Sequence, residues 1–236
     1  MQKGILVDLL PVLPGGLNGG AKIMVIDLLK NMFKLRPHIQ WTLLIQHGME
    51  KELSELSMSN VHFMILNESP FTFIYNFTFF FIRKLRKKTP LPNYIHLKFL
   101  KIINYIRPYA IKKIKNLDYG LLFCPFTDPV FHKKNIPTVS IVYDLQYMTY
   151  PFFFDLDDLT HRQQVIKNAC SRATHLITIS EYTRSKLLEK QKLPAHKITT
   201  IPICLGDRLK INFYSMHILN KYQLKAKNYL IYPANY

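Results

Sequence analysis

Short apolar runs alternate with helical stretches along most of this chain, and this alternation constrains the fold more than any other feature. Strands that alternate with helices predict a parallel sheet with crossover helices. We therefore expect an α/β fold: a Rossmann-like parallel sheet with helices on both faces. The predicted strands are residues 3–9, 41–46, 61–66, 119–123, 137–143, 174–179 and 197–201; the predicted helices are residues 21–35, 94–114, 160–172 and 181–191, and a polar helical stretch joins the second and third strands.

Two of the predicted helices carry clear boundary signals. Pro37 lies just past the end of the first helix, where a stop signal is expected. Ser180 precedes the helix that begins at Glu181, and a serine there caps an orphan amide while the glutamate opposes the positive end of the helix dipole. The apolar residues at helical spacing in the first helix are Ile23, Ile26, Leu29 and Phe33.

The chain is strongly basic. It holds 32 Lys and Arg residues against 15 Asp and Glu residues, a net charge of +17 over 236 residues. Such a charge attracts phosphates on nucleic acids, anionic lipids or sugar diphosphates, although a solvated basic surface explains it equally well. The sequence has no groove-reading helix motif and no aromatic-basic sheet signature, so we do not expect a nucleic-acid partner.

The cysteines and the N-terminus favour a cytoplasmic protein. Cys124, Cys170 and Cys204 match no zinc or redox spacing, and a small odd number of cysteines favours reduced thiols. The first ten residues read as a short strand, without the basic region and cleavage site of a signal peptide.

Residues 71–88 combine aromatic and basic side chains. They read FTFIYNFTFFFI followed by RKLRKK. The apolar part is too short to cross a bilayer, which needs about 20 residues. Aromatic rings beside a cationic cluster suit an anionic membrane surface, so one prediction is peripheral binding to the inner face of the membrane. A helix packed on the sheet, with solvated lysines beyond it, is the alternative.

A glycine-rich loop follows the first predicted strand. Residues 11–22 read PVLPGGLNGGAK and lead into a helix. Glycines allow a ligand to approach the backbone, and the positive end of a helix suits a phosphate. The loop matches neither the dinucleotide fingerprint GxGxxG nor a P-loop, and a simple turn is the alternative.

Polar residues also follow two later strands. Asp144 comes directly after a buried apolar run, where ligands of parallel sheets bind. A carboxylate there accepts a proton or binds sugar hydroxyls, or it merely caps a local turn. Ser180 follows the next strand, at the same edge of the sheet.

These segments resemble the family 4 glycosyltransferases of the two-Rossmann-domain type, the GT-B fold. Members carry a GG-x-GG-like loop, then HDLQ and YPEFF, then ISE-[FY]-[ST]-R and a downstream P-x-x-K-[IV]-x-x-[IV]-P. The matching residues here are Gly15, Gly16, Gly19 and Gly20; Asp144, Leu145, Gln146, Tyr150, Pro151, Phe153 and Phe154; and Ser180, Glu181, Tyr182, Thr183, Arg184, Pro194, Lys197, Ile201 and Pro202.

The resemblance implies the N-terminal half of a GT-B fold from a retaining, mannosyltransferase-like enzyme. Such an enzyme moves a hexose, mannose for example, from a GDP- or UDP-sugar co-substrate to a glycan or lipid-linked acceptor, with no metal and no further cofactor. The glycine loop then faces the leaving diphosphate. The implied substrate-binding residues are Gly16, Asn18, Gly19, Gly20, Gln146, Ser180 and Glu181, and the candidate catalytic residues are Asp144 and Tyr143.

The sequence departs from the family pattern at two positions. Tyr143 replaces the family's His, which lies near the transferred sugar, and this puts a catalytic role there in question. Phe152 replaces the Glu of YPEFF. A non-catalytic module that binds a glycan or a partner subunit is therefore the alternative function.

The resemblance also divides the chain. Residues 1–204 correspond to the acceptor-side domain and residues 205–228 to a linker with a short helix. Residues 229–236 read YLIYPANY, which is similar to the first strand of the family's donor-binding domain. We therefore expect a chain that lacks most of the donor half and does not transfer sugar alone.

Overall fold

The structure is a computed structural model that describes residues 3–16, 18–66, 114, 117–204, 216–225 and 228. The chain divides into two compact units, Met1–Ile203 and Cys204–Tyr236. The second unit holds the short helix α7 (Met216–Lys221), which agrees with the short helix predicted between residues 205 and 228. The described residues include only Ile114 of the predicted helix at 94–114. The aromatic-basic stretch at 71–88 and the predicted strand at 229–232 lie outside them.

The first unit is built on a parallel sheet of seven described strands. Their order is β3-β2-β1-β4-β5-β6-β7, and every neighbouring pair is parallel. Six of these strands fall within predicted apolar runs, and β4 extends one residue beyond its predicted run, so the predicted fold class is confirmed. The strands are β1 (Ile5–Asp8), β2 (Trp41–Gln46), β3 (Val61–Leu66), β4 (Leu121–Cys124), β5 (Thr138–Val142), β6 (His175–Thr178) and β7 (Ile198–Thr200).

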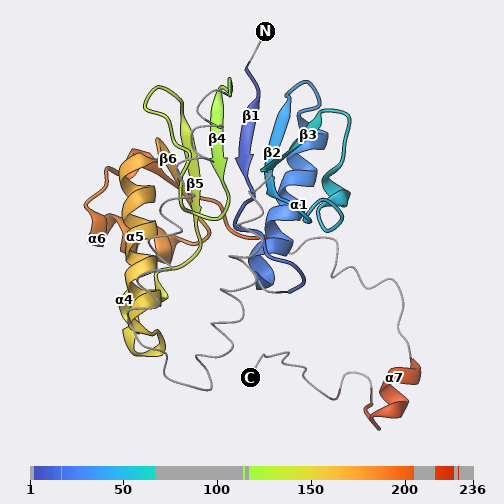
Figure 1. Cartoon of the computed structure of the whole chain (residues 1–236). Helices are drawn as coiled ribbons and strands as arrows, with labels where there is room; N and C mark the ends of the chain where they lie inside the picture. Colours follow the sequence, from blue (N-terminus) through green and yellow to red (C-terminus); the bar gives the residue numbers. More distant parts are fainter. Residues whose placement is uncertain are drawn as a thin grey trace, which may run out of the picture. The chain divides into compact units, whose positions relative to one another are not determined.

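The chain reverses its direction across the sheet beside β1. It runs from β1 outward to β2 and β3, and then resumes on the other side of β1 with β4 to β7 (Figure 1). In a doubly wound sheet the crevice outside the carboxyl ends of the strands at such a switch point is where ligands bind. The loops after β1 and β4 flank this point.

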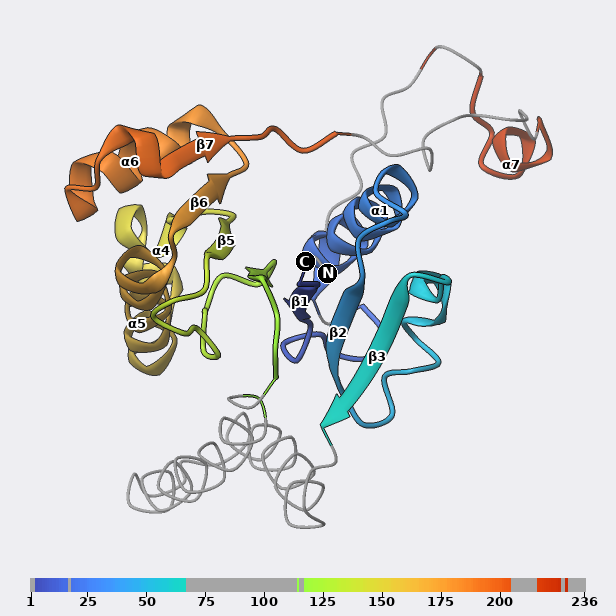
Figure 2. The ribbon, with the colours of Figure 1, turned by 90° about the horizontal axis from the view of Figure 1, so that it is seen from above.

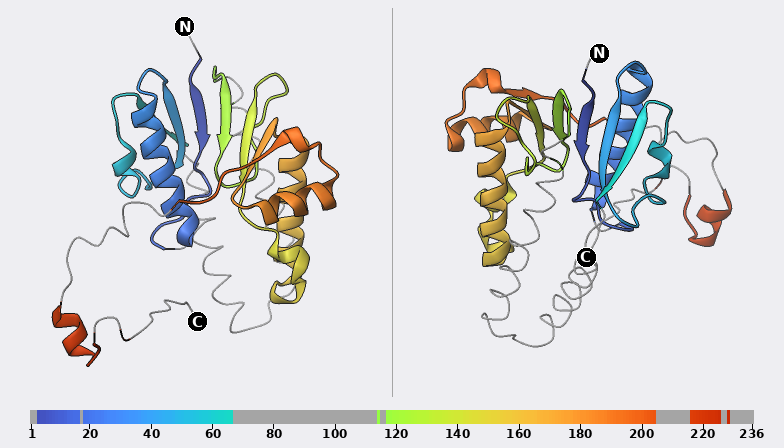
Figure 3. Two further views of the ribbon diagram at one scale, coloured as in Figure 1. Left: turned by 180° about the vertical axis from the view of Figure 1, so that it is seen from behind. Right: turned by 45° about the horizontal axis from the view of Figure 1, so that its top comes forward.

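Helices cover both faces of the sheet (Figure 2, Figure 3). The helix α1 (Gly19–Leu35) packs on one face, and α5 (Leu156–Arg172) and α6 (Glu181–Gln191) pack on the other. Alternate strand residues divide between the faces, as the two-residue period of a strand requires. Val7, Leu43, Phe123 and Ile141 join the core beneath α1, whereas Val142, Leu176 and Ile198 join the core beneath α5 and α6.

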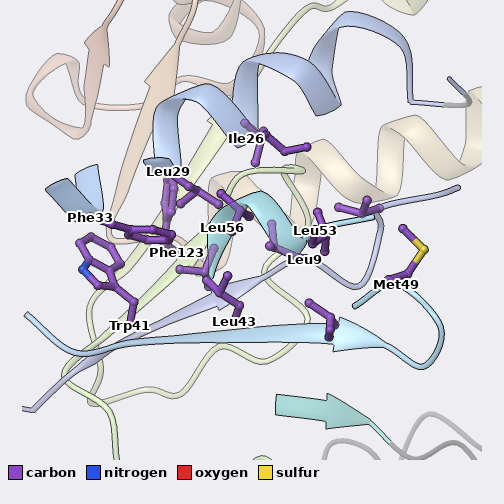
Figure 4. Packing of buried hydrophobic residues seen from close by; sticks show 14 of the residues in the cluster. Leu9, Ile26, Leu29, Phe33, Trp41, Leu43, Met49, Leu53, Leu56 and Phe123 are labelled. Carbon is purple, nitrogen blue, oxygen red and sulfur yellow. The ribbon is translucent and has the colours of Figure 1, made fainter. Parts of the chain in front are cut away.

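The core beneath α1 is closed by aromatic and aliphatic side chains. The rings of Phe33 and Trp41 lie with their centroids 5.0 Å apart, and Leu53 and Leu56 pack into the same cluster (Figure 4). Leu56 belongs to the single short 3-10 turn η1 (Ser54–Leu56), which stands where the sequence predicts a polar helical stretch. That prediction was wrong in extent, because the buried leucines of this segment need only one turn to reach the core.

Two helix predictions need correction. The helix α1 begins at Gly19, not at residue 21, and its buried face includes Lys22 and Val25, while Ile23 is exposed. The helix α5 begins at Leu156, four residues before the prediction, because the Asp155 carboxylate accepts a 2.8 Å hydrogen bond from the Asp158 amide and caps the helix there.

The short elements α4 (Gln146–Thr149), η2 (Pro151–Phe153) and η3 (Ala195–Lys197) complete the first unit.

A buried amide holds the C-terminal end of α1. Asn60 precedes β3, and its Nδ2 lies 3.3, 3.4 and 3.3 Å from the carbonyl oxygens of Phe33, Arg36 and Ile39. The last carbonyls of a helix have no partner within the helix, so this side chain satisfies groups that burial would otherwise penalise.

No described helix is long and apolar enough to cross a membrane.

We predict that Asn60→Ala lowers the free energy of unfolding by about 1–2 kcal/mol, because the carbonyl of Phe33, which is buried, and those of Arg36 and Ile39, whose bonds are partly buried, lose this donor. Urea unfolding of the 236-residue chain measures this. The control is Asn31→Ala, whose exposed amide donates only to the Asp27 carbonyl of its own helix. Equal effects of the two substitutions would contradict the role of Asn60.

Candidate functional site

The candidate site lies at the carboxyl edge of the sheet, where the loops after β1, β2, β4, β5 and β6 meet solvent. The sequence places a glycine loop after β1, the YDLQ segment after β5 and Ser180 after β6. The parallel register brings all three to one edge. Their contacts divide them into a glycine-loop group and a group formed by the ends of β5 and β6.

The glycine loop needs glycine at two of its positions. Gly15 and Gly19 have φ angles of 61° and 56°, in the left-handed region that favours glycine. A Cβ added at Gly16 or Gly20 would meet no atom within 4 Å, so these two glycines leave open space above the loop. The backbone there is accessible to a ligand.

Asn18 holds the glycine loop together. Its Oδ1 accepts a 2.6 Å hydrogen bond from the Leu13 amide, and its Nδ2 donates a 3.1 Å bond to the Pro11 carbonyl. The side chain does not cap α1, although Asn18 is the residue before the helix. The predicted ligand-binding role of Asn18 therefore competes with two bonds inside the loop.

An ion pair between a buried lysine and a partly exposed glutamate anchors the same loop. The Lys22 ammonium donates 3.0 Å hydrogen bonds to the Leu13 and Gly15 carbonyls, and it pairs with the Glu52 carboxylate after β2. Glu52 also accepts a 2.9 Å bond from the Gly15 amide. The bond from Lys22 holds the pKa of Glu52 below its usual value.

Neither Lys22 nor Glu52 was predicted as a site residue from the sequence. A lysine in the first turn of a helix opposes the helix dipole, so its burial requires compensating acceptors. Only 8% of the Lys22 side chain is exposed, and two carbonyls and a carboxylate supply that compensation. The available signal was a lysine two residues after the last glycine of the loop, but its partner lies 30 residues further along the chain.

The end of β5 contributes Tyr143 and Asp144. The Tyr143 hydroxyl donates a 2.8 Å hydrogen bond to the Pro125 carbonyl after β4, and burial raises the pKa of this hydroxyl. Asp144 is exposed, and its Oδ1 accepts a 3.0 Å bond from the Gln146 amide. Asp144 thus closes a local turn, while its carboxylate and the Gln146 side chain face solvent.

The end of β6 is locked to the end of β5. Ser180 caps α6 by accepting a 3.1 Å bond from the Thr183 amide, and the Thr183 hydroxyl donates a 3.2 Å bond to the Tyr143 carbonyl. Glu181 is exposed and lies 3.6 Å from Arg184. The predicted residues Tyr143, Asp144, Gln146, Ser180 and Glu181 are therefore brought together, whereas the glycine loop makes its contacts with Glu52.

Two acidic side chains at the switch point were not predicted as site residues from the sequence. Asp8 ends β1 and is buried, and its Oδ1 accepts a 3.1 Å bond from the Leu10 amide. Asp128 follows β4, and its Oδ1 accepts a 3.1 Å hydrogen bond from the side-chain Nδ2 of Asn168 in α5. Burial, with these two carboxylates nearby, holds the pKa of the Cys124 thiol well above its usual value.

Thr127 adds backbone strain at the same point. It has a φ of 75°, unusual for a β-branched residue, and its hydroxyl donates a 2.7 Å bond to the Ile141 carbonyl.

Among the described residues, no group of three or more His, Cys, Asp or Glu side chains is arranged to hold a metal ion.

Comparison with known proteins yields fold likenesses only. No protein-family model matches the sequence, and no curated protein sequence matches it. An Arabidopsis thaliana glycosyltransferase solved with UDP-L-rhamnose is similar at 12% identity and a TM-score of 0.47, covering 90% of this chain and 55% of that one. A Rickettsia africae glycosyltransferase is similar at 14% identity and a TM-score of 0.42, covering 96% and 51%.

A third solved structure, the calicheamicin glycosyltransferase CalG4, is similar at 13% identity and a TM-score of 0.45, covering 86% of this chain and 53% of that one. The chain thus spans about half the length of these structures. Identities and scores of this size carry no argument about activity. The strand order itself establishes the α/β fold.

We predict that Glu52→Gln destabilises the chain at neutral pH and that the difference from wild type shrinks in acid. Because folding lowers the pKa of Glu52, its stabilising contribution is present above 4.5 and is lost as the pH falls through the lowered value. Urea unfolding at a series of pH values from 7 to 3 measures this.

The matched control is Glu55→Gln, which removes a more exposed ion pair to Lys30. We expect a small effect there, as surface pairs contribute little. A Glu52→Gln effect that stays constant with pH would contradict the ionic role of this carboxylate.

Proposed function

We propose that this chain is the N-terminal, acceptor-side half of a GT-B glycosyltransferase. In the complete enzyme it acts with a donor-binding half to transfer a hexose, mannose being the first candidate, from a GDP- or UDP-sugar to a glycan or lipid-linked acceptor. The observation that carries this proposal is the position of the three family-like segments. Each lies at the carboxyl end of a strand, at one edge of one parallel sheet.

The glycine loop and the start of α1 suit the leaving diphosphate. The side chain before α1 does not cap the helix, unlike Asp155 before α5 and Ser180 before α6. The Gly19 amide donates a 2.8 Å hydrogen bond to the Gly16 carbonyl, so the candidate donors are the next amides, those of Gly20 and Ala21, which the Asn18 side chain does not cap. The positive end of the helix dipole lies behind them. Negative charge that develops on the diphosphate is stabilised by such fixed donors.

Asp144 and Gln146 suit the hydroxyls of the acceptor or the sugar. Both side chains are exposed, and the turn that joins them fixes the Asp144 carboxylate beside the end of β5. A carboxylate in this place orients a hydroxyl and accepts its proton. Tyr143 has its hydroxyl committed to Pro125, so we assign it to the wall of the site and not to proton transfer.

The remaining elements of the proposal concern location. We propose that the protein acts in the cytoplasm, at the inner face of the membrane, and that residues 71–88 bind an anionic lipid surface. Support comes from the sequence of that segment, twelve mostly aromatic and apolar residues followed by RKLRKK. Liposome flotation with and without anionic lipid tests it, and binding that ignores lipid charge would remove this element alone.

A non-catalytic glycan-binding module is the second candidate function. Tyr143 stands at the family's His position with its hydroxyl engaged in a structural bond, which favours loss of catalysis at that position. Sugar transfer assays separate the two candidates. The 236-residue chain and the product of the same reading frame extended beyond Tyr236 are incubated with GDP-mannose, UDP-glucose and candidate acceptors.

If the proposal is right, we expect transfer by the extended protein and none by the 236-residue chain, because the proposed donor-binding half would supply part of the cleft. Transfer by the 236-residue chain alone would show that it needs no donor half. Absence of transfer by both proteins, with glycan binding retained, would favour the binding module.

We predict that Asp144→Asn lowers kcat/KM of the extended protein by about 100-fold without changing stability. Asparagine keeps the Oδ1 that accepts from the Gln146 amide, so the turn survives while the charge is lost. Steady-state kinetics and thermal unfolding measure the two quantities, with Glu55→Gln as the control. Unchanged kinetics would restrict Asp144 to its turn.

We predict that Tyr143→Phe lowers the free energy of unfolding by about 1 kcal/mol and leaves kcat of the extended protein unchanged. The substitution removes the bond to Pro125 and retains the ring. A tenfold or greater loss of kcat would instead place the hydroxyl in the reaction.

A further inference from the structure

Residues 144–158 form an acidic and aromatic stretch within a basic chain. They contain four of the 15 acidic residues and none of the 32 basic residues. They also contain five aromatic rings in fifteen positions. Because the stretch begins at Asp144, it extends directly from the candidate site through α4 and η2 to the start of α5 (Figure 1).

The five rings divide into two that anchor the stretch and three that are presented to solvent. Tyr147 is buried beneath α5, and Phe154 stacks against the Arg162 guanidinium at 4.8 Å. We call the other three, Tyr150, Phe152 and Phe153, the aromatic cluster. The Phe152 and Phe153 centroids lie 4.5 Å apart, and Tyr150 lies 6.2 Å from each.

The aromatic cluster is exposed although its backbone is ordered by hydrogen bonds. Phe152 and Phe153 are each 75% exposed, and Leu156 beside them is 77% exposed. The Tyr150 amide donates to the Gln146 carbonyl at 2.8 Å, and the Phe154 amide donates to the Pro151 carbonyl at 3.1 Å. Exposed rings that contribute nothing to a core, yet are held in contact, mark an interaction surface.

The charge around the cluster decides which partner suits it. Asp144, Asp155 and Asp157 are exposed, and Asp158 is partly exposed. Asp158 pairs with Arg162 of α5 at 3.1 Å. The stretch itself holds no lysine or arginine to attract an anionic membrane or a diphosphate, and the exposed Asp144 and Asp155 carboxylates disfavour both. A neutral ligand that offers both apolar faces and hydroxyl donors satisfies the rings and the carboxylates together.

We propose that the aromatic cluster and the neighbouring Asp144 and Gln146 side chains bind the neutral sugar units of the acceptor glycan. The apolar C–H face of a pyranose packs on the Phe152 and Phe153 rings, and its hydroxyls donate to the carboxylates. The phosphate of a lipid-linked acceptor then lies away from this stretch. The proposal rests on the proposed glycosyltransferase function and names the part of the acceptor that this surface holds.

The test uses the 236-residue chain and its Phe152→Ala/Phe153→Ala double variant. Because both rings are so exposed, we expect an unchanged thermal unfolding temperature. The matched control is Leu35→Ala, which removes a 74% exposed apolar side chain at the far end of α1. Tetrasaccharides of mannose, glucose and galactose are titrated against each protein, and saturation-transfer NMR measures the dissociation constants.

We expect millimolar binding of at least one tetrasaccharide, weakened by about fivefold or more in the double variant and unchanged in the control. Binding that is equal in all three proteins would overturn the proposal, and so would the absence of binding to any tetrasaccharide. Flotation with phosphatidylcholine vesicles that depends on Phe152 and Phe153, without tetrasaccharide binding, would assign the cluster to a lipid surface instead. Self-association that the double variant abolishes, without tetrasaccharide binding, would assign it to a second copy.

This outcome is separable from the proposed activity. Tetrasaccharide binding without sugar transfer by the extended protein would remove the transferase and leave the glycan surface. Sugar transfer that is insensitive to the double substitution, with no tetrasaccharide binding, would leave the transferase and remove the surface.

Discussion

Burial of both faces of a parallel sheet is the constraint on which the rest of this structure depends. Parallel neighbours need crossover connections, and each described crossover returns the chain to the amino edge of the sheet. The loops at the carboxyl edge therefore do not have to form the tight turns that join antiparallel strands. The glycine loop, the Asp144 turn and the Ser180 cap all occupy this edge for that reason.

The two groups at this edge are held by different interactions. Charge holds the glycine loop, because Lys22 and Glu52 are brought together beneath it from segments 30 residues apart. Neutral hydrogen bonds hold the ends of β5 and β6, where Tyr143 bonds to Pro125 and Thr183 bonds to Tyr143. A change of pH near neutrality or below therefore acts on the bonds that join segments in the first group, and not on the neutral bonds that join the ends of β4, β5 and β6.

The fold was predictable because its information is local. Each strand is an apolar run that can be recognised without its neighbours, and the Ser180 cap lies within three residues of the amide that it binds. The start of α5 was missed because Asp155 caps it in advance of any apolar periodicity. Within the site, Asp144 was found by its place after a buried strand, and Tyr143 by its place at the His position of the family pattern. The partners of Lys22 and of Tyr143 come from other loops, and no spacing in the sequence reveals such pairs.

The burial of Lys22 also decides what kind of attraction an anion would feel at the glycine loop. The nearest lysine has its charge offset by Glu52 and its donors directed at the Leu13 and Gly15 carbonyls. An anion at the start of α1 would then meet fixed peptide dipoles at close range instead of a mobile ammonium group. Attraction by peptide dipoles acts only within the first turn of the helix. Which anion binds there therefore depends on its shape and its hydrogen-bond geometry, and little on the net positive charge of the chain.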